Sequence, residues 1–341
     1  MNGGLSSELR PLLRGYLGEF EDCFARGEPA GHLLTYVSGQ LSDLRRKSIG
    51  PIADAAGIPP RTLQHFLSRH AWDEELVLDT LQQIVGRNHQ HPRSIGIIDE
   101  TAHPKKGDRT PGVERQWCRT TGRMDNCVLT VHLGYVAGGF HCLLDGELFL
   151  PKSWADARQR CRRAGIPEEM THRPQWQIAL DMYRRAVANG VRFEWLAFDE
   201  HYGQFAELLF RLDDRGQRYV AEVPPTFSGW LIKPALLQKG RHQGKGRPRR
   251  PARLKSRDAP AGSIEDLCRL PYPVQSRPWR RLHIKEGAEE PIILEAKAVR
   301  FHLERDDLPT WPHLLILARS AADPTRVKYF VSRHAVHTRT L

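Results

Sequence analysis

The chain has 341 residues, of which 40% are hydrophobic, and its 51 basic residues outnumber its 40 acidic residues to give a net charge of +11. This length is sufficient for two domains, or for one large domain with an appendage, around a packed core. No stretch approaches the roughly 18 apolar residues of a membrane span, and the N-terminus lacks a signal pattern, so we expect a soluble, cytoplasmic protein without a membrane partner.

The first part of the chain, residues 1–90, is predicted to be helical. Apolar residues recur at helical spacing in LRPLLRGYLGEFEDCF (9–24) and again in EELVLDTLQQIVGR (74–87). We therefore assign residues 1–90 to a helical N-terminal region, separate from the rest of the chain.

Residues 52–70, IADAAGIPPRTLQHFLSRH, have the outline of a helix-turn-helix. Gly57 suits a tight turn between helices, and Thr62 after Pro60 can open a second helix with apolar residues on one face. The outward side chains that could then meet DNA are Arg61, Gln64, His65 and Arg69. An ordinary helical hairpin packed in a bundle explains the same pattern, so both interpretations stay open.

From residue 91 onward the pattern changes to short strand-like runs, which predict a mixed α/β fold. The predicted strands are 94–99, 127–137, 140–151, 193–199 and 218–223, with a turn at Ala137–Gly139. Residues 174–190 predict an amphipathic helix that ends at Gly190.

Two of these predicted strands end on the same pair of acids. The run SIGIID is followed by Glu100, and FEWLAFD is followed by Glu200 and then by Gly203 and a new helix. Strand ends present functional side chains in α/β sheets, so Asp99 and Asp199 could share one site if the strands are neighbours. The alternative is that each aspartate caps the segment that follows it.

Two adjacent carboxylates repel each other and need either a shared proton or a divalent cation. Mg²⁺ prefers such oxygen ligands, and Mn²⁺ is the alternative ion. Two ions about 4 Å apart could activate a water and stabilise the departing oxygen of a phosphodiester. Asp99 and Asp199 are therefore our candidate metal ligands and catalytic residues.

A basic segment at about residues 226–260 carries most of the positive charge. Ten basic residues and no acid lie between Thr226 and Arg257, so +11 minus these ten leaves +1 for the rest. The Gly- and Pro-rich core, 238–257, predicts a flexible loop. Clustered cations displace counterions from nucleic acid, which makes Arg247, Arg249 and Arg250 candidate DNA contacts, although a solvated linker is the simpler alternative.

Three motifs give the chain a family resemblance. The block that begins IIDETAHPKKG at Ile97, LLDGELFLPKSW (143–154) and FDEHYG (198–203) resemble DDE-type transposases of bacterial insertion sequences. More narrowly, they are similar to the group of insertion sequence 701, with its DDE superfamily endonuclease domain. The resemblance implies a ribonuclease H-like fold for 91–341, and Asp99 and Asp199 as the first two metal-binding acids.

The resemblance also implies DNA as the partner, both at the element ends and at the target. Hydrolysis of a phosphodiester at the element end would be followed by attack of the freed 3′ hydroxyl on target DNA, and a homodimer on paired ends would suit this role. Basic and polar residues shortly after Asp99 would contact phosphates, namely Lys105, Lys106, Arg115, Gln116 and Arg119. A solvated basic loop is the alternative.

One departure from the family concerns its third acid, a glutamate on a helix after the last strands. The chain reaches Leu341 without that helix, while Glu295 and Glu304 fall on predicted strands and Glu286, Glu289 and Glu290 in a predicted turn. This predicts a truncated or frame-interrupted transposase that is deficient in cleavage. The alternatives are a non-catalytic DNA-binding remnant or repressor, and a metal-dependent nuclease that needs two acids.

Overall fold

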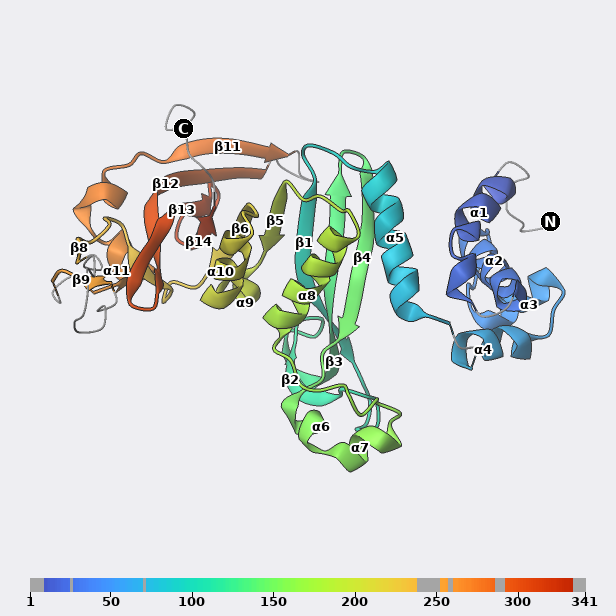
Figure 1. Ribbon diagram of the computed structural model, residues 1–341. Helices are drawn as coiled ribbons and strands as arrows, with labels where there is room; N and C mark the ends of the chain where they lie inside the picture. Colours follow the sequence, from blue (N-terminus) through green and yellow to red (C-terminus); the bar gives the residue numbers. More distant parts are fainter. Residues whose placement is uncertain are drawn as a thin grey trace, which may run out of the picture. The chain divides into compact units, whose positions relative to one another are not determined.

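The computed structural model describes residues 9–24, 27–69, 72–237, 252–256, 260–285 and 292–333. The chain divides into two compact units (Figure 1). The first comprises residues 1–89 together with 185–191, and the second comprises 90–184 with 192–341. None of the described helices is both long enough and apolar enough to cross a membrane.

The first unit is helical where it is described, as predicted. Its elements are α1 (Leu9–Gly18), a 3₁₀ turn (Glu21–Cys23), α2 (Gly27–Leu41), α3 (Ile49–Ala56), α4 (Pro60–Ser68) and α5 (Glu74–Asn88). An aromatic core holds them together, in which the rings of Phe24 and Trp72 stack at 5.9 Å and Phe66 is fully buried. Aromatic pairs at this separation add stability beyond their buried area.

Helices α3 and α4 are joined by a short turn, which both the helix-turn-helix and the helical-hairpin interpretations predict. Gly57 ends α3 with a left-handed φ of 68°, and its N–H bonds the carbonyls of Ala53 and Asp54. Leu63 and Phe66 of α4 are completely buried. The opposite side of the helix therefore faces outward, as expected for an amphipathic element.

The second unit is built on a mixed sheet of twelve strands, in the order β10-β7-β12-β13-β14-β6-β5-β1-β3-β2, with β11 on β12 and β4 on β3. The strands near the acids are β1 (Ile95–Pro104), β2 (Glu114–Cys118), β3 (Arg123–Ala137), β4 (Phe140–Leu148), β5 (Trp195–Phe198) and β6 (Tyr219–Val223). The others are β7 (Ser228–Trp230), β10 (Gly262–Ser263), β11 (Arg280–Lys285), β12 (Ile292–Arg305), β13 (Leu308–Ser320) and β14 (Val327–Ser332).

Helices flank this sheet, so the predicted ribonuclease H-like α/β class is confirmed. They are α6 (Lys152–Asp156), α7 (Arg158–Arg163), α8 (Gln175–Ala188), α9 (Glu200–Gly203), α10 (Ala206–Asp214), α11 (Ile264–Cys268) and a π-helical turn (Pro271–Gln275). The predicted helix at 174–190 is α8, which is followed by Gly190 at φ 91°. Gln175 at its start shares a cavity wall with Ala102 of β1 and Leu129 of β3.

The predicted end of the first strand at Asp99 is wrong. β1 continues to Pro104, because it pairs antiparallel with β3 along its whole length, from Ile95↔Val136 to Pro104↔Cys127. Its parallel pairing with β5, however, stops at Ile98↔Phe198. From Asp99 onward β1 thus keeps one neighbour and has an open edge on the β5 side within the described residues.

The basic segment is not a loop throughout. β7 pairs with β10 and β12, and β8 (Leu236–Leu237) forms a two-stranded sheet with β9 (Arg253–Leu254). The prediction of a loop for all of 238–257 is therefore wrong at β9. The candidate DNA contacts Arg247, Arg249 and Arg250 lie outside the described residues.

Candidate active site

Asp99 and Asp199 lie side by side because β1 and β5 are parallel neighbours. Each follows the last residue pair of that parallel ladder, Ile98↔Phe198. Asp199 is the N-cap of α9, where its Oδ1 accepts a hydrogen bond from the His201 N–H at 3.1 Å. Asp199 thus has the capping role that was the alternative interpretation of the sequence. The cap fixes its carboxylate at the end of β5.

Glu100 joins the two aspartates. Ligand oxygens of Asp99, Glu100 and Asp199 all lie within 4.8 Å of one another. Neighbouring residues of a strand point to opposite faces, yet oxygens of Asp99 and Glu100 lie close together where β1 has lost its pairing with β5. The Glu100 side chain is only 11% exposed, and its Oε2 is buried without a hydrogen-bond partner among the described residues.

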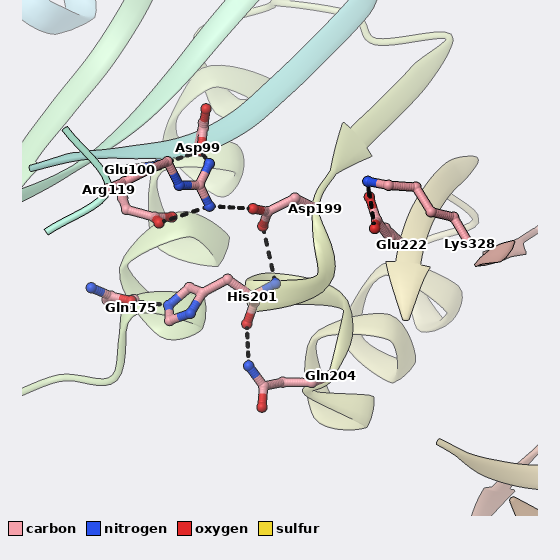
Figure 2. Close-up of polar contacts among 9 residues, drawn as sticks. All are labelled: Asp99, Glu100, Arg119, Gln175, Asp199, His201, Gln204, Glu222 and Lys328. Carbon is pink, nitrogen blue, oxygen red and sulfur yellow. Dashed lines mark hydrogen bonds and ion pairs between the residues drawn. The ribbon is translucent and has the colours of Figure 1, made fainter. Parts of the chain in front are cut away.

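Arg119, just after β2, binds all three acids (Figure 2). Its guanidinium lies 3.2 Å from Asp99 Oδ1, 3.1 Å from Glu100 Oε1 and 2.5 Å from Asp199 Oδ2. The guanidinium fork suits this multiple recognition of carboxylates. One positive charge therefore faces three negative ones.

The electrostatics of this cluster follow from burial and crowding. Burial raises the pKa of the Glu100 carboxyl, the nearby His201 and Arg119 oppose that rise, and the charges of Asp199 and Asp99 add to it. The hydrogen bond to Asp199 raises the pKa of Arg119. The site thus holds excess negative charge, which a divalent cation would neutralise.

Gly203 sets the position of α9 beneath Asp199. A Cβ on this residue would lie 1.9 Å from the backbone carbonyl oxygen of Glu222 in β6. Only glycine permits this approach of α9 to the sheet, which explains the small residue noted after the second acid pair. Beside it, burial raises the pKa of the Tyr202 hydroxyl well above its ordinary value.

Comparison with known proteins identifies the family of this chain. The family model described as "DDE superfamily endonuclease" matches residues 19–291. The chain belongs to the DDE superfamily endonucleases. Members of this family act on DNA and use divalent metals, which gives the acid cluster its chemical context.

A relative from Microchaete diplosiphon is named "Probable transposase for insertion sequence element IS701". It is 27% identical over 187 residues, which cover 54% of this chain and 46% of the relative. The chain therefore spans about half the length of this relative, and the predicted resemblance to the group of insertion sequence 701 is confirmed.

The remaining predicted DNA contacts lie on the surface of each unit. In the second unit Lys105, Lys106 and Arg115 are exposed, and Gln116 is half-buried with its amide donating to Cys127 O at 3.2 Å. In the first unit Arg61, Gln64 and Arg69 are exposed. The Nε–H of Arg61 donates a hydrogen bond to Nε2 of His65 at 3.5 Å. Arg119 differs from these residues, because the acids already engage it.

The later glutamates stand apart from the cluster as far as they are described. Glu295 of β12 pairs with Arg319 at 2.8 Å and with Arg281 at 3.3 Å. These arginines lower the pKa of its carboxyl. Glu304 also lies on β12, as predicted, while Glu286, Glu289 and Glu290 lie outside the described residues.

Sequence reasoning missed Glu100 as a member of the site, although it is adjacent to Asp99. It also missed His201 and Gln175, whose side chains are hydrogen-bonded to each other beside the acids (Figure 2). The signal for His201 was present in the FDEHYG motif. Gln175 belongs to α8, and only the folded sheet brings it near.

Proposed function

We propose that this chain is an insertion-sequence transposase that cuts and joins phosphodiesters at the ends of its element. The observation that carries the proposal is the meeting of Asp99 and Asp199 at the end of two parallel strands, in a chain of an endonuclease family. The IS701 transposase relative supports the choice of DNA transposition among the reactions open to such a site.

Asp99 and Asp199 would hold the divalent ions, with Mg²⁺ as the expected ion and Mn²⁺ as the alternative. Three carboxylates with ligand oxygens within 4.8 Å fit hard cations, and the unpartnered Oε2 of Glu100 leaves an acceptor for one of them. Bound ions would activate a water and stabilise the departing oxygen. We assign Glu100 as the third acid of this site.

The protein's own residues would position the two aspartates and contact the DNA. The α9 N-terminus holds the Asp199 carboxylate, and the β1–β3 ladder holds the backbone that carries Asp99. Lys105, Lys106 and Arg115 are exposed on the surface of the same unit and would contact the DNA backbone. A homodimer on paired element ends completes the proposal.

The test is cleavage of a duplex that carries the DNA flanking the coding sequence of this protein, with and without Mg²⁺ or Mn²⁺. Asp99→Asn and Asp199→Asn should each abolish metal-dependent cleavage while DNA binding remains. Asp156→Asn, at an exposed aspartate of α6, is the matched control and should cleave as the wild type does. Binding without cleavage in the wild type would instead favour the non-catalytic remnant or repressor.

A further inference from the structure

A cavity of about 380 Å³ lies beside the acid cluster. Glu100 and Arg119 belong both to its wall and to the cluster, while Trp117, Phe149 and Phe205 supply aromatic surface. Its volume falls at the lower end of the range of about 300–1,000 Å³ for small-molecule sites. That size suits one nucleoside rather than a larger ligand.

Most aromatic walls of the cavity are held in place. The ring of Phe149 meets His172 edge-on at 5.6 Å, and Nδ1 of His172 is 2.9 Å from the Leu150 carbonyl. Phe205 meets His201 edge-on at 6.3 Å. These contacts fix the shape of the cavity before any ligand binds.

Trp117 differs from Phe149 and Phe205 because it is largely exposed to solvent. The residue is 58% exposed on β2, and Met124, its cross-strand partner on β3, is 51% exposed. Unlike a tryptophan exposed elsewhere on the surface, Trp117 lines the cavity and therefore offers it an uncovered aromatic surface. A planar aromatic ligand would cover it by stacking.

The proposed function supplies such a ligand. A phosphate that reaches the acid cluster carries its own nucleoside with it, and the cavity shares Glu100 and Arg119 with that cluster. A paired base inside a duplex cannot enter a cavity, so the base must be unpaired, either at a single-stranded end or after extrusion from the duplex. Stacking on aromatic side chains is the usual way in which proteins hold such bases.

We propose that this cavity receives one unpaired nucleobase adjoining the phosphate at the acid cluster, stacked against Trp117. The inference rests on the proposed function, and it adds a base site to the phosphate chemistry. The edges of the base would meet the amides of Gln116 and Gln175, which also line the cavity. Because stacking reads any base face, the site would tolerate different bases.

The experiment compares two short fluorescent strands with the same number of phosphates, using the whole chain with Ca²⁺, a hard cation that suits the carboxylates of the cluster. One strand is fully abasic, and the other carries a single central adenine. Wild type should bind the adenine strand roughly five- to 150-fold more tightly, as expected for one stacked base. Trp117→Ala should remove most of this preference and leave affinity for the abasic strand unchanged.

Two further variants control for folding and for general stickiness. Trp117→Phe keeps an aromatic ring and should retain part of the preference. Trp311→Ala removes a tryptophan of β13 that is 81% exposed, and it should behave as the wild type does. Circular dichroism checks that each variant is folded.

The proposal is overturned if wild type shows no preference for adenine, or if Trp117→Ala keeps it in full. Because the readout is binding and not cleavage, this outcome is separate from failure of the proposed function. A chain that prefers adenine but never cleaves DNA would keep the base site and refute the endonuclease activity. A chain that cleaves DNA without any adenine preference would refute the base site alone.

Discussion

Replacing Arg119 by alanine should tighten the binding of divalent metal in the absence of DNA. The guanidinium contacts one oxygen of each of Asp99, Glu100 and Asp199, and a metal ion needs oxygens of the same carboxylates. Arginine and metal therefore compete. Removal of the arginine leaves three acids with greater mutual repulsion, which an ion can relieve.

The size of the effect follows from the three ion pairs. The Arg119 side chain is 48% exposed, so each pair takes the modest value of solvent-exposed pairs, about 0.5–1 kcal/mol. Together they amount to about 1.5–3 kcal/mol. Arg119→Ala should then tighten metal binding by roughly 10- to 150-fold. Arg119→Lys has a compact charge in place of the planar fork, so its metal affinity should lie between those of the wild type and Arg119→Ala.

Isothermal titration of Mn²⁺ into the metal-free chain at low ionic strength measures this change. Arg115→Ala removes an exposed arginine of the neighbouring strand β2, and as the matched control it should leave the affinity at its wild-type value. The same titration of Asp99→Asn identifies which heat belongs to the acid cluster. An Arg119→Ala chain that binds Mn²⁺ no better than the wild type would refute the competition.

Three more predictions concern other parts of the chain. Gly203→Ala should lower the free energy of unfolding by about 1–3 kcal/mol in urea, since its Cβ would meet the Glu222 backbone; Gly15→Ala, in open space, should show no such loss. Burial lowers the pKa of His302, so the unfolded chain takes up a proton there first as the pH falls below about 6.5. The free energy of unfolding therefore falls in that range. Between about pH 7.5 and about pH 5.5 it should fall less for His302→Gln than for the wild type, and an equal fall in both would contradict this. Arg61→Ala should weaken DNA binding evenly across sequences and reduce the salt slope by about one if this residue contacts phosphate, which binding isotherms at several salt concentrations decide.

The elements near the site were predictable because their periodicities are local. Alternation and β-branched content located β3, β4, β5 and β6, and helical spacing located α8. β2 was missed, since a five-residue segment with Arg115 and Gln116 at its centre has weak strand character by itself. It is a strand because its residues pair with 123–127 of β3, a tertiary contact that composition does not contain.

The two aspartates were predictable as a pair, whereas the full cluster was not. A strand that ends on an acid is visible in the sequence, and two of them predict a shared site if the strands are neighbours. Glu100 was recognised only as the residue that follows Asp99, and alternation along a strand would send its side chain to the opposite face. What brings it back is the loss of a parallel partner after Ile98, and only strand pairing shows where that loss occurs.

Charge decides what the cluster can accept. With three carboxylates and one guanidinium the net charge is −2, so a phosphate is repelled at the point where it should react, even in a chain of +11. Two divalent cations would change this net charge of −2 to +2, which would attract a phosphate. Because the cations need the carboxylate oxygens that Arg119 contacts, they would compete with its guanidinium. A displaced guanidinium would be available to an arriving DNA backbone. The phosphate contact predicted for Arg119 and its observed contacts with the acids would then be alternative positions of one side chain, with metal binding selecting between them.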